Sequence, residues 1–110
     1  MRKMTLIAAA ALALASAPAL AADDIERTIV IKDHLFQPAE VHVPAQQKVK
    51  LVIDNQDPTP EEFESHDLRV EKVVPGNSTA TVRVGPLEAG TYSFVGEFHE
   101  DTAQGSLVVE

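Results

Sequence analysis

The sequence predicts an all-β protein. From residue 22 onward, no segment long enough for a globular helix shows apolar residues at 3.6-residue spacing, whereas several short runs alternate apolar and polar residues. Residues 48–53 and 79–84 alternate most clearly, as strands do when one face is buried and the other is solvated. Turn-forming residues separate these runs at regular intervals. Short strands with such punctuation are typical of an antiparallel sandwich or barrel.

We expect about seven strands in one domain. They are residues 26–33, 39–43, 48–54, 66–74, 78–84, 91–97 and 106–109, with residues 55–65 as a loop. Pro44, Asp57-Pro58, Pro75-Gly76-Asn77, Gly85-Pro86 and Ala89-Gly90 supply the turns between them.

Tyr92 is the only tyrosine, and Leu87-x-x-Gly90-x-Tyr92 is typical of a tyrosine corner, in which the hydroxyl bonds back to the preceding connection. We read it as architecture. Phe36, Phe94 and Phe98 are expected in the core.

The N-terminus has the three parts of a secretory signal peptide. Arg2 and Lys3 form the positive region, residues 4–14 the apolar region, and Ala19-Leu20-Ala21 the cleavage site. We therefore expect a signal peptide at residues 1–21 and a mature domain at residues 22–110, exported to the periplasm. A retained membrane anchor is the weaker interpretation, because the apolar stretch is rich in Ala and interrupted by Ser16 and Pro18, and the acidic pair Asp23-Asp24 follows it. We therefore expect no direct membrane insertion of the mature chain.

Composition restricts the chemistry of the chain. There is no cysteine, and both methionines lie within the expected signal peptide, so disulfides and thiolate metal sites are excluded. Without Arg2 and Lys3, seven Lys and Arg face 17 Asp and Glu, a net charge of −10 with His neutral. Such a surface repels nucleic acid and anionic lipid and attracts cations. Acidity that serves only solubility is an equally good interpretation of the charge alone.

Residues 90–105, GTYSFVGEFHEDTAQG, resemble the last strand and ligand loop of cupredoxins. In that pattern Gly96 stands at the blue-copper cysteine, His99 at the histidine ligand and Gln104 at the axial methionine. The resemblance implies a cupredoxin-like Greek-key β-sandwich. Loss of the thiolate moves the site toward harder donors, which favours Cu(II), Fe or Zn over a Cu(I)/Cu(II) shuttle. Gln104 is a candidate axial ligand, or a residue that orients water or bonds the loop.

The four histidines differ in promise. His99 occupies a cupredoxin ligand position, and His66, which we expect to open a strand after the loop, resembles the first cupredoxin histidine. These two would meet at one end of the sandwich. We favour a surface position for His34, although it could also lie near that end. His42 alternates with valines and should face solvent.

Carboxylates surround both candidate histidines. Glu61, Glu62 and Glu64 precede His66, and Glu97, Glu100 and Asp101 surround His99. Two imidazoles with one or two carboxylates can hold Fe(II), Cu(II) or Zn(II). Glu64 and Glu97 are the first choices, although alternation puts Glu97 on the face opposite Gly96. An acidic, solvated rim with no metal is the alternative.

The runs EEFESHDL (residues 61–68) and EFHEDTAQG (residues 97–105) are similar to a narrower family, the small periplasmic cupredoxin-like proteins that accompany bacterial high-affinity iron permeases. This resemblance implies a module that binds copper or iron and helps to oxidise Fe(II) or to hand iron to an inner-membrane permease, with other periplasmic proteins as partners. Carried onto this chain, that role falls on Glu62, Glu64, His66, Glu97 and His99.

Two other functions remain open. The chain could be a periplasmic Cu(II) buffer or chaperone, although the absence of Met and Cys from the mature domain argues against Cu(I) traffic. It could also be a docking module without metal. We expect no catalytic residues: Ser65-His66-Asp67 are consecutive and cannot converge as a relay, and no phosphate-binding loop is present. An accessory part in Fe(II) oxidation is left open.

Overall fold

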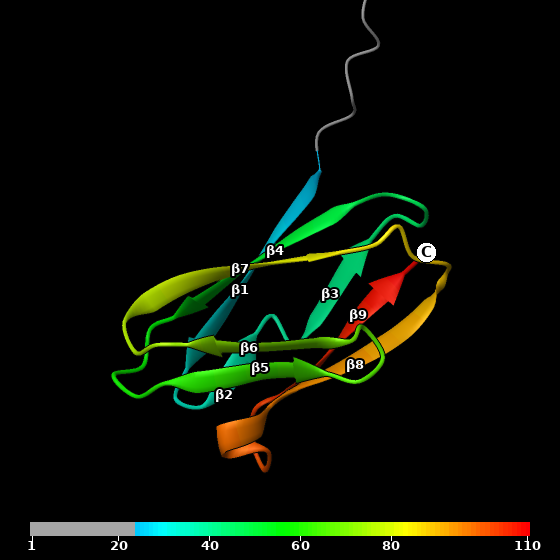
Figure 1. The fold of residues 1–110 in the computed structure, drawn as a ribbon. Coiled ribbons are helices and arrows are strands. Elements are labelled where there is room, and N and C mark those ends of the chain that lie inside the picture. The colour runs from blue at the N-terminus through cyan, green and yellow to red at the C-terminus, as the bar shows by residue number, and fades with distance from the viewer. Residues whose placement is uncertain (1–23) are drawn as a thin grey trace, which may run out of the picture.

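The computed structural model describes residues 24–110, so the expected signal peptide lies outside the described residues. They form nine strands and one 3-10 helix (Figure 1). The elements are β1 (Ile25–Lys32), β2 (Leu35–Gln37), β3 (Glu40–Val43), β4 (Val49–Asn55), β5 (Glu61–Ser65), β6 (Val70–Val74), β7 (Ser78–Val84), β8 (Gly90–Gly96), η1 (Glu97–His99) and β9 (Gln104–Val109). Among these residues no helix has the length and hydropathy needed to span a bilayer.

The strands form two sheets that pack face to face, which confirms the predicted sandwich. One sheet has the order β2-β1-β4-β7 and the other β3-β9-β8-β5-β6. The β1–β4 and β3–β9 pairs are parallel, and the other pairs are antiparallel. β8 and β5 are neighbours although β6 and β7 lie between them in sequence. This long-range pairing is what brings the candidate site residues of two distant segments together.

The core lies between the sheets. Along β4 every second side chain is buried, as its alternating sequence predicts. Phe36 from one sheet packs edge-on against Phe63 and Phe94 from the other, with ring centroids 5.9 and 5.1 Å away. Each aromatic pair adds about 0.5–1.5 kcal/mol beyond the area it buries. The prediction that Phe98 belongs to this core is wrong, because Phe98 is 48% exposed.

Tyr92 closes the connection before β8. Its hydroxyl donates to the carbonyl of Glu88 at 2.8 Å, so the predicted tyrosine corner is present. His42 is also where the sequence places it, on the solvent side of β3, where its ring contacts Glu40 and Glu110.

The expected loop at residues 55–65 contains a strand. β5 is an internal strand, paired with both β6 and β8. The sequence EEFES does not predict a strand, because glutamate is depleted in strands, and the neighbouring strands of the sheet decide the structure of such a segment. The prediction that His66 opens the following strand is wrong. His66 lies in the turn between β5 and β6.

Asn55 fixes the approach to β5. Its buried side-chain amide donates to the carbonyls of Thr59 and Val74 at 2.9 and 3.2 Å, and its oxygen accepts from the amide of Asp57 at 3.1 Å. This loop also passes so close to Gly76 that a Cβ there would collide with the Pro58 carbonyl. The start of β5 is therefore held in one position.

Candidate metal centre

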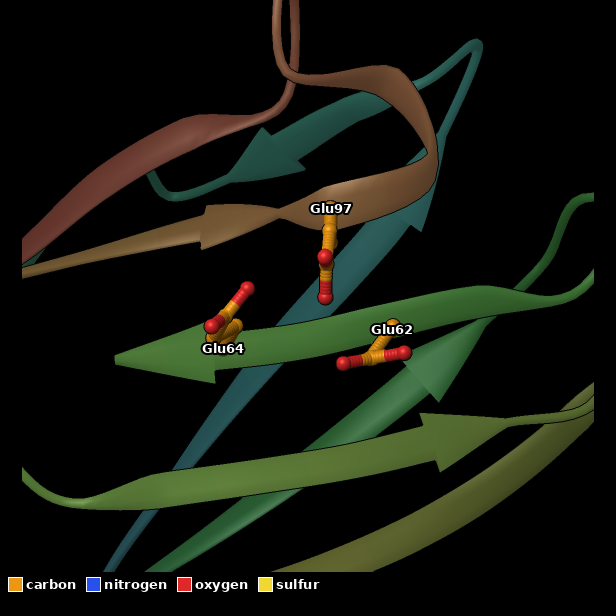
Figure 2. Close-up of side chains that lie close together, drawn as sticks. All are labelled: Glu62, Glu64 and Glu97. Atoms are coloured by element: carbon orange, nitrogen blue, oxygen red, sulfur yellow. The ribbon is translucent and has the colours of Figure 1, made fainter. Parts of the chain in front are cut away.

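Glu62, Glu64 and Glu97 form a cluster on the outer face of the sheet that contains β5. Each offers a carboxylate oxygen, and the three oxygens lie within 4.8 Å of one another. In Figure 2 Glu97 points from the end of β8 toward β5, where Glu62 and Glu64 stand on the same face of the strand. We call these three residues the carboxylate cluster.

Strand register explains how the carboxylate cluster forms. Alternation along β5 puts residues 62 and 64 on one face and residues 61, 63 and 65 on the other. β5 pairs with β8 so that Phe63 lies opposite Gly96. Continuing this antiparallel register by one residue sets Glu97 opposite Glu62. The cluster is thus a product of the β5–β8 pairing.

The three carboxylates repel one another when all are charged. The pKa of Glu62 is raised to about 8. The main cause is the neighbouring carboxylates of Glu97 and Glu71, which can share a proton with Glu62, and partial burial adds to the effect. The carboxylate of Glu97 and burial likewise raise the pKa of Glu64. In turn, hydrogen bonding from Glu62 and Glu64 lowers the pKa of Glu97. Crowding of these carboxylates therefore favours proton uptake by the cluster, and a cation bound at the same place would compete with that proton.

One carboxylate oxygen of Glu62 stands apart within residues 24–110. Glu62 is only 8% exposed, and its Oε1 atom is buried without a hydrogen-bond partner among residues 24–110. Buried polar atoms almost always have a partner, and a bound ion is one explanation of an exception.

His66 lies beside the carboxylate cluster with its side chain in solvent. Its side chain is 95% exposed, and its Nε2 atom is 3.6 Å from Oε1 of Glu64, too far for a hydrogen bond. Its turn is firmly held, because Ser65 donates to the carbonyl of Ser93 at 2.6 Å and Asp67 accepts from the amide of Ser93 at 2.8 Å. An anchored turn with an exposed imidazole can bring a nitrogen donor to the cluster.

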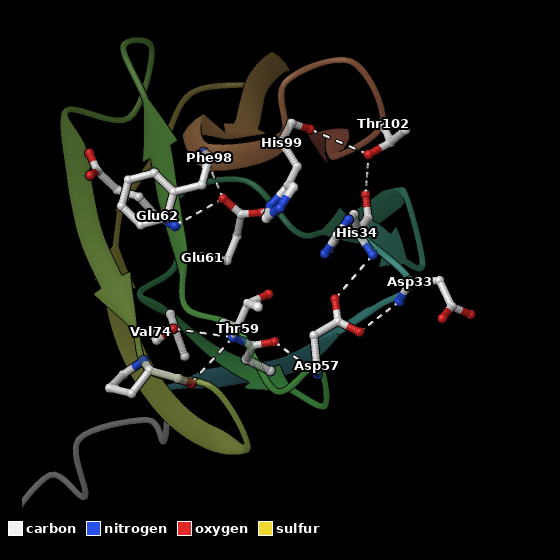
Figure 3. Close-up of polar contacts among 12 residues, drawn as sticks. Asp33, His34, Asp57, Thr59, Glu61, Glu62, Val74, Phe98, His99 and Thr102 are labelled. Carbon is white, nitrogen blue, oxygen red and sulfur yellow. Dashed lines mark hydrogen bonds and ion pairs between the residues drawn. The ribbon is translucent and has the colours of Figure 1, made fainter.

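His99 contacts different residues from His66. Its Nδ1 atom is 2.6 Å from Oε2 of Glu61, which lies on the inner face of β5, and its ring stacks on that of His34 (Figure 3). The structure thus puts His66 and His99 with carboxylates on opposite faces of β5. It also corrects the preference for a surface position of His34, which is partly buried in this stack.

Gln104 begins β9 and is exposed. Its side-chain amide donates to the carbonyl of Glu100 at 2.8 Å, which closes the loop after η1. This is one of the three roles considered for it from the sequence, and direct ligation by Gln104 stays a prediction.

Sequence reasoning missed Glu61 as a special residue. Glu61 is 1% exposed, while its neighbour Glu62 faces outward. The sequence does contain a signal for its burial, because strand alternation places Glu61 on the same face as Phe63 and Ser65. It could be used only once residues 61–65 were known to be a strand.

The residues do not fit a blue-copper centre. Residues 24–110 contain no Cys and no Met, and a Cβ atom at position 96 would lie 2.7 Å from the carboxyl carbon of Glu61 and 2.7 Å from the Cβ of Ala103. The space that a side chain at position 96 would need is therefore already filled by Glu61 and Ala103. What remains are carboxylate and imidazole donors, which suit Fe, Mn, Zn or Cu(II).

Comparisons with known proteins agree with this fold. The model of the cupredoxin-like domain family matches residues 5–109. The uncharacterized protein RP394 of Rickettsia prowazekii (strain Madrid E) is 48% identical over 85 residues, which cover 77% of this chain and 68% of that protein.

Two solved structures show the same architecture at low identity. The metal-binding domain of the Cu(I)-exporting P-type ATPase CopA of Streptococcus pneumoniae D39 has a TM-score of 0.69 at 15% identity, over 77% of this chain and 84% of that one. Auracyanin A, a blue copper protein of Chloroflexus aurantiacus, has a TM-score of 0.68 at 20% identity, over 80% of this chain and 100% of that one. The family model spans nearly the whole sequence, and the chain belongs to the cupredoxin-like domain family.

Proposed function

We propose that this chain is a metal-binding protein that holds a hard cation at Glu62, Glu64 and Glu97. The observation that carries the proposal is the meeting of three carboxylates within 4.8 Å of one another, one of which, Glu62, has a buried oxygen, Oε1, without a partner among residues 24–110. A cation bound there would satisfy that oxygen and compete with protons for the three carboxylates. His66 would supply a nitrogen donor when its side chain turns toward Glu64.

Iron is the cargo that we propose. Oxygen donors stabilise Fe(III) over Fe(II), so an all-carboxylate cluster favours oxidation of bound Fe(II) by an external acceptor such as dioxygen or Cu(II). The acidic surface concentrates cations near the site. Together with the similarity of residues 61–68 and 97–105 to proteins that accompany iron permeases, this supports a role in periplasmic iron uptake with delivery to a permease.

A Cu(II) buffer is the second candidate. It is favoured by His66 beside Glu64, since imidazole suits Cu(II) well, and by structural neighbours described as copper proteins. The two functions differ in whether the carboxylate cluster binds iron or Cu(II) more tightly. A docking module without metal would bind neither ion there.

Metal titration of matched variants tests the site. Fe(II) is added anaerobically and aerobically, with and without Cu(II), while binding and Fe(III) formation are followed. Glu62→Gln, Glu64→Gln and Glu97→Gln should each weaken binding by at least about tenfold, equivalent to about 1.4 kcal/mol. Glu26→Gln is the control, because Glu26 is an exposed carboxylate on β1 in the other sheet.

The outcomes separate the candidates. Preference for Fe(II) or Fe(III) over Cu(II) supports the iron function, and the reverse preference supports the buffer. A wild-type protein that binds neither ion would leave only the docking role. A protein that responds to Glu26→Gln as strongly as to the cluster variants would show that the ion is not held at the carboxylate cluster.

Export is a separate part of the proposal. Residues 1–21 would be removed, so the exported protein should begin at Ala22. Mass spectrometry of the protein recovered from the periplasm tests this directly. Recovery of the full-length chain from the cytoplasm alone would contradict both export and permease delivery.

A further inference from the structure

Glu61 is a buried carboxylate that is not part of the carboxylate cluster. We propose that Glu61 is a positioning residue, which holds Glu97 against Glu62 and Glu64. This inference rests on the metal site proposed above. It concerns how the three ligands, which come from two separate segments, reach one place.

The Glu61 carboxylate contacts the chain on both sides of Glu97. Its Oε1 atom accepts from the amide of Phe98 at 2.9 Å, and its Oε2 atom is 2.6 Å from Nδ1 of His99 (Figure 3). On the other side, a Cβ at Gly96 would be only 2.9 Å from Oε2. Glu97 therefore has little freedom to move away from β5.

The Glu61 carboxylate also bonds to the backbone of β5, the strand that carries Glu62 and Glu64. Its Oε1 atom also accepts from the amide of Glu62 at 3.0 Å. One side chain thus joins the backbone of a β5 ligand to the η1 segment that carries Glu97. Charge-assisted hydrogen bonds are shorter and stronger than neutral ones, so this connection is stiff.

Gly96 is what admits the Glu61 carboxylate. In the pattern that residues 90–105 resemble, position 96 carries the metal-binding cysteine. Here the volume next to position 96 contains the Glu61 carboxylate and the Cβ of Ala103. With no side chain at position 96 and a buried acid at position 61, this place in the fold supports ligands on the outer face and is not itself a ligand position.

The loop after β8 keeps its own closure without Glu61. The amide of Gly96 donates to the carbonyl of Ala103, and the amide of Ala103 donates to the carbonyl of His99, both at 2.8 Å. Removing the Glu61 charge should therefore leave the loop folded and release its tether to β5. The geometry predicts a loss of metal affinity larger than a simple loss of stability would cause.

Mn(II) binding to a set of variants tests this role. Glu61→Gln keeps the size of the side chain and removes the charge, and it should weaken Mn(II) binding by about tenfold or more, as for other groups that orient metal ligands. The Glu61→Gln/Glu97→Gln protein should bind Mn(II) as Glu97→Gln alone does. In contrast, adding Glu61→Gln to the Glu64→Gln protein should lower its Mn(II) affinity by the same factor as in the wild type, because the position of Glu64 does not depend on η1.

Two further proteins control for stability and folding. Thr102→Val removes a hydroxyl that donates to the carbonyl of His34 at the same end of the sandwich, and it should lower stability without changing Mn(II) affinity. Gly96→Ala pushes on the Glu61 carboxylate and keeps every charge, so it carries the test if Glu61→Gln does not fold. Affinities of Glu61→Gln or Gly96→Ala within about twofold of wild type, or additivity with Glu97→Gln, would overturn the proposal.

A metal-free measurement separates this inference from the proposed function. Residual dipolar couplings over residues 96–99 and amide exchange at Phe98 report the position of the Glu97 segment directly. Glu61→Gln should shift both if Glu61 positions Glu97. A wild type that binds no Mn(II) would refute the metal site, whereas unchanged couplings in Glu61→Gln would refute the positioning role.

Discussion

The imidazole ring of His34 stacks on that of His99, with ring centroids 3.5 Å apart and planes 14° from parallel. His34 lies in the turn between β1 and β2, and His99 ends η1. Thr102 reinforces the contact, because its hydroxyl donates to the carbonyl of His34 at 2.6 Å. The stack joins a hairpin of one sheet to the loop that extends from the other.

His34→Ala should therefore lower the free energy of unfolding by about 1 kcal/mol, a common value for an aromatic pair. Urea denaturation measures this change. His42→Ala is the matched control, because His42 is exposed on β3, and it should cost less than about 0.5 kcal/mol. Equal effects of the two substitutions would show that the stack is not stabilising.

Asp57 should make the protein sensitive to acid. Burial works to raise the pKa of Asp57, but hydrogen bonds from the amides of His34 and Asp33 outweigh it and hold that pKa below its ordinary 3.8. A lowered pKa contributes stability that is present above 3.8 and is lost as the pH falls through the folded-state value.

The stability difference between wild type and Asp57→Asn should thus shrink as the pH falls from about 5 to about 2. Denaturation curves at a series of pH values provide the comparison. A difference that stays constant over this range would exclude Asp57 as a source of the acid sensitivity.

Glu62 should have the opposite pH dependence in the metal-free protein. Its folded-state pKa is raised from 4.5 to about 8, so the folded form binds the proton more tightly than the unfolded form does. Stability from this group is fully present below 4.5 and is lost as the pH rises toward 8. Glu62→Gln should reduce this loss of stability at rising pH. A saturating concentration of a cation should offset the loss in the wild type but not in Glu62→Gln. A decline equal in wild type and Glu62→Gln would place its source elsewhere.

Gly96→Ala should destabilise the protein by about 1–3 kcal/mol, the usual cost of overpacking. The added Cβ would lie 2.7 Å from the Cβ of Ala103, and replacing that residue should relieve part of the clash. Thermal unfolding of Gly96→Ala and Gly96→Ala/Ala103→Gly measures the relief, with Ala103→Gly as the reference for the cost of the second change. Full tolerance of Gly96→Ala would mean that the space beside Gly96 is not tightly filled.

Tyr92→Phe should cost about 1 kcal/mol, because it removes the hydroxyl that donates to the Glu88 carbonyl and little else. Chemical denaturation gives the value. Folding and metal affinity should be retained, since the corner lies at the start of β8 and the carboxylate cluster at its end. A parallel loss of metal affinity would show that the corner controls the site.

The sequence by itself determined the sandwich, the tyrosine corner and the outward position of His42. These features depend on local information: alternation in residues 48–54 and 78–84, turn residues between the strands, and a hydroxyl whose partner is four residues away. Such signals act over a few residues, so they can be read without knowing the partners of each strand.

The tertiary structure alone decided how the candidate ligands are divided. Residues 61–65 carry three glutamates and weak strand propensity, and they form β5 only because β6 and β8 pair with them. That pairing buries Glu61 and leaves Glu62 and Glu64 on the outer face, where Glu97 joins them. A shift of one residue in register would exchange the two faces, and long-range pairing sets the register.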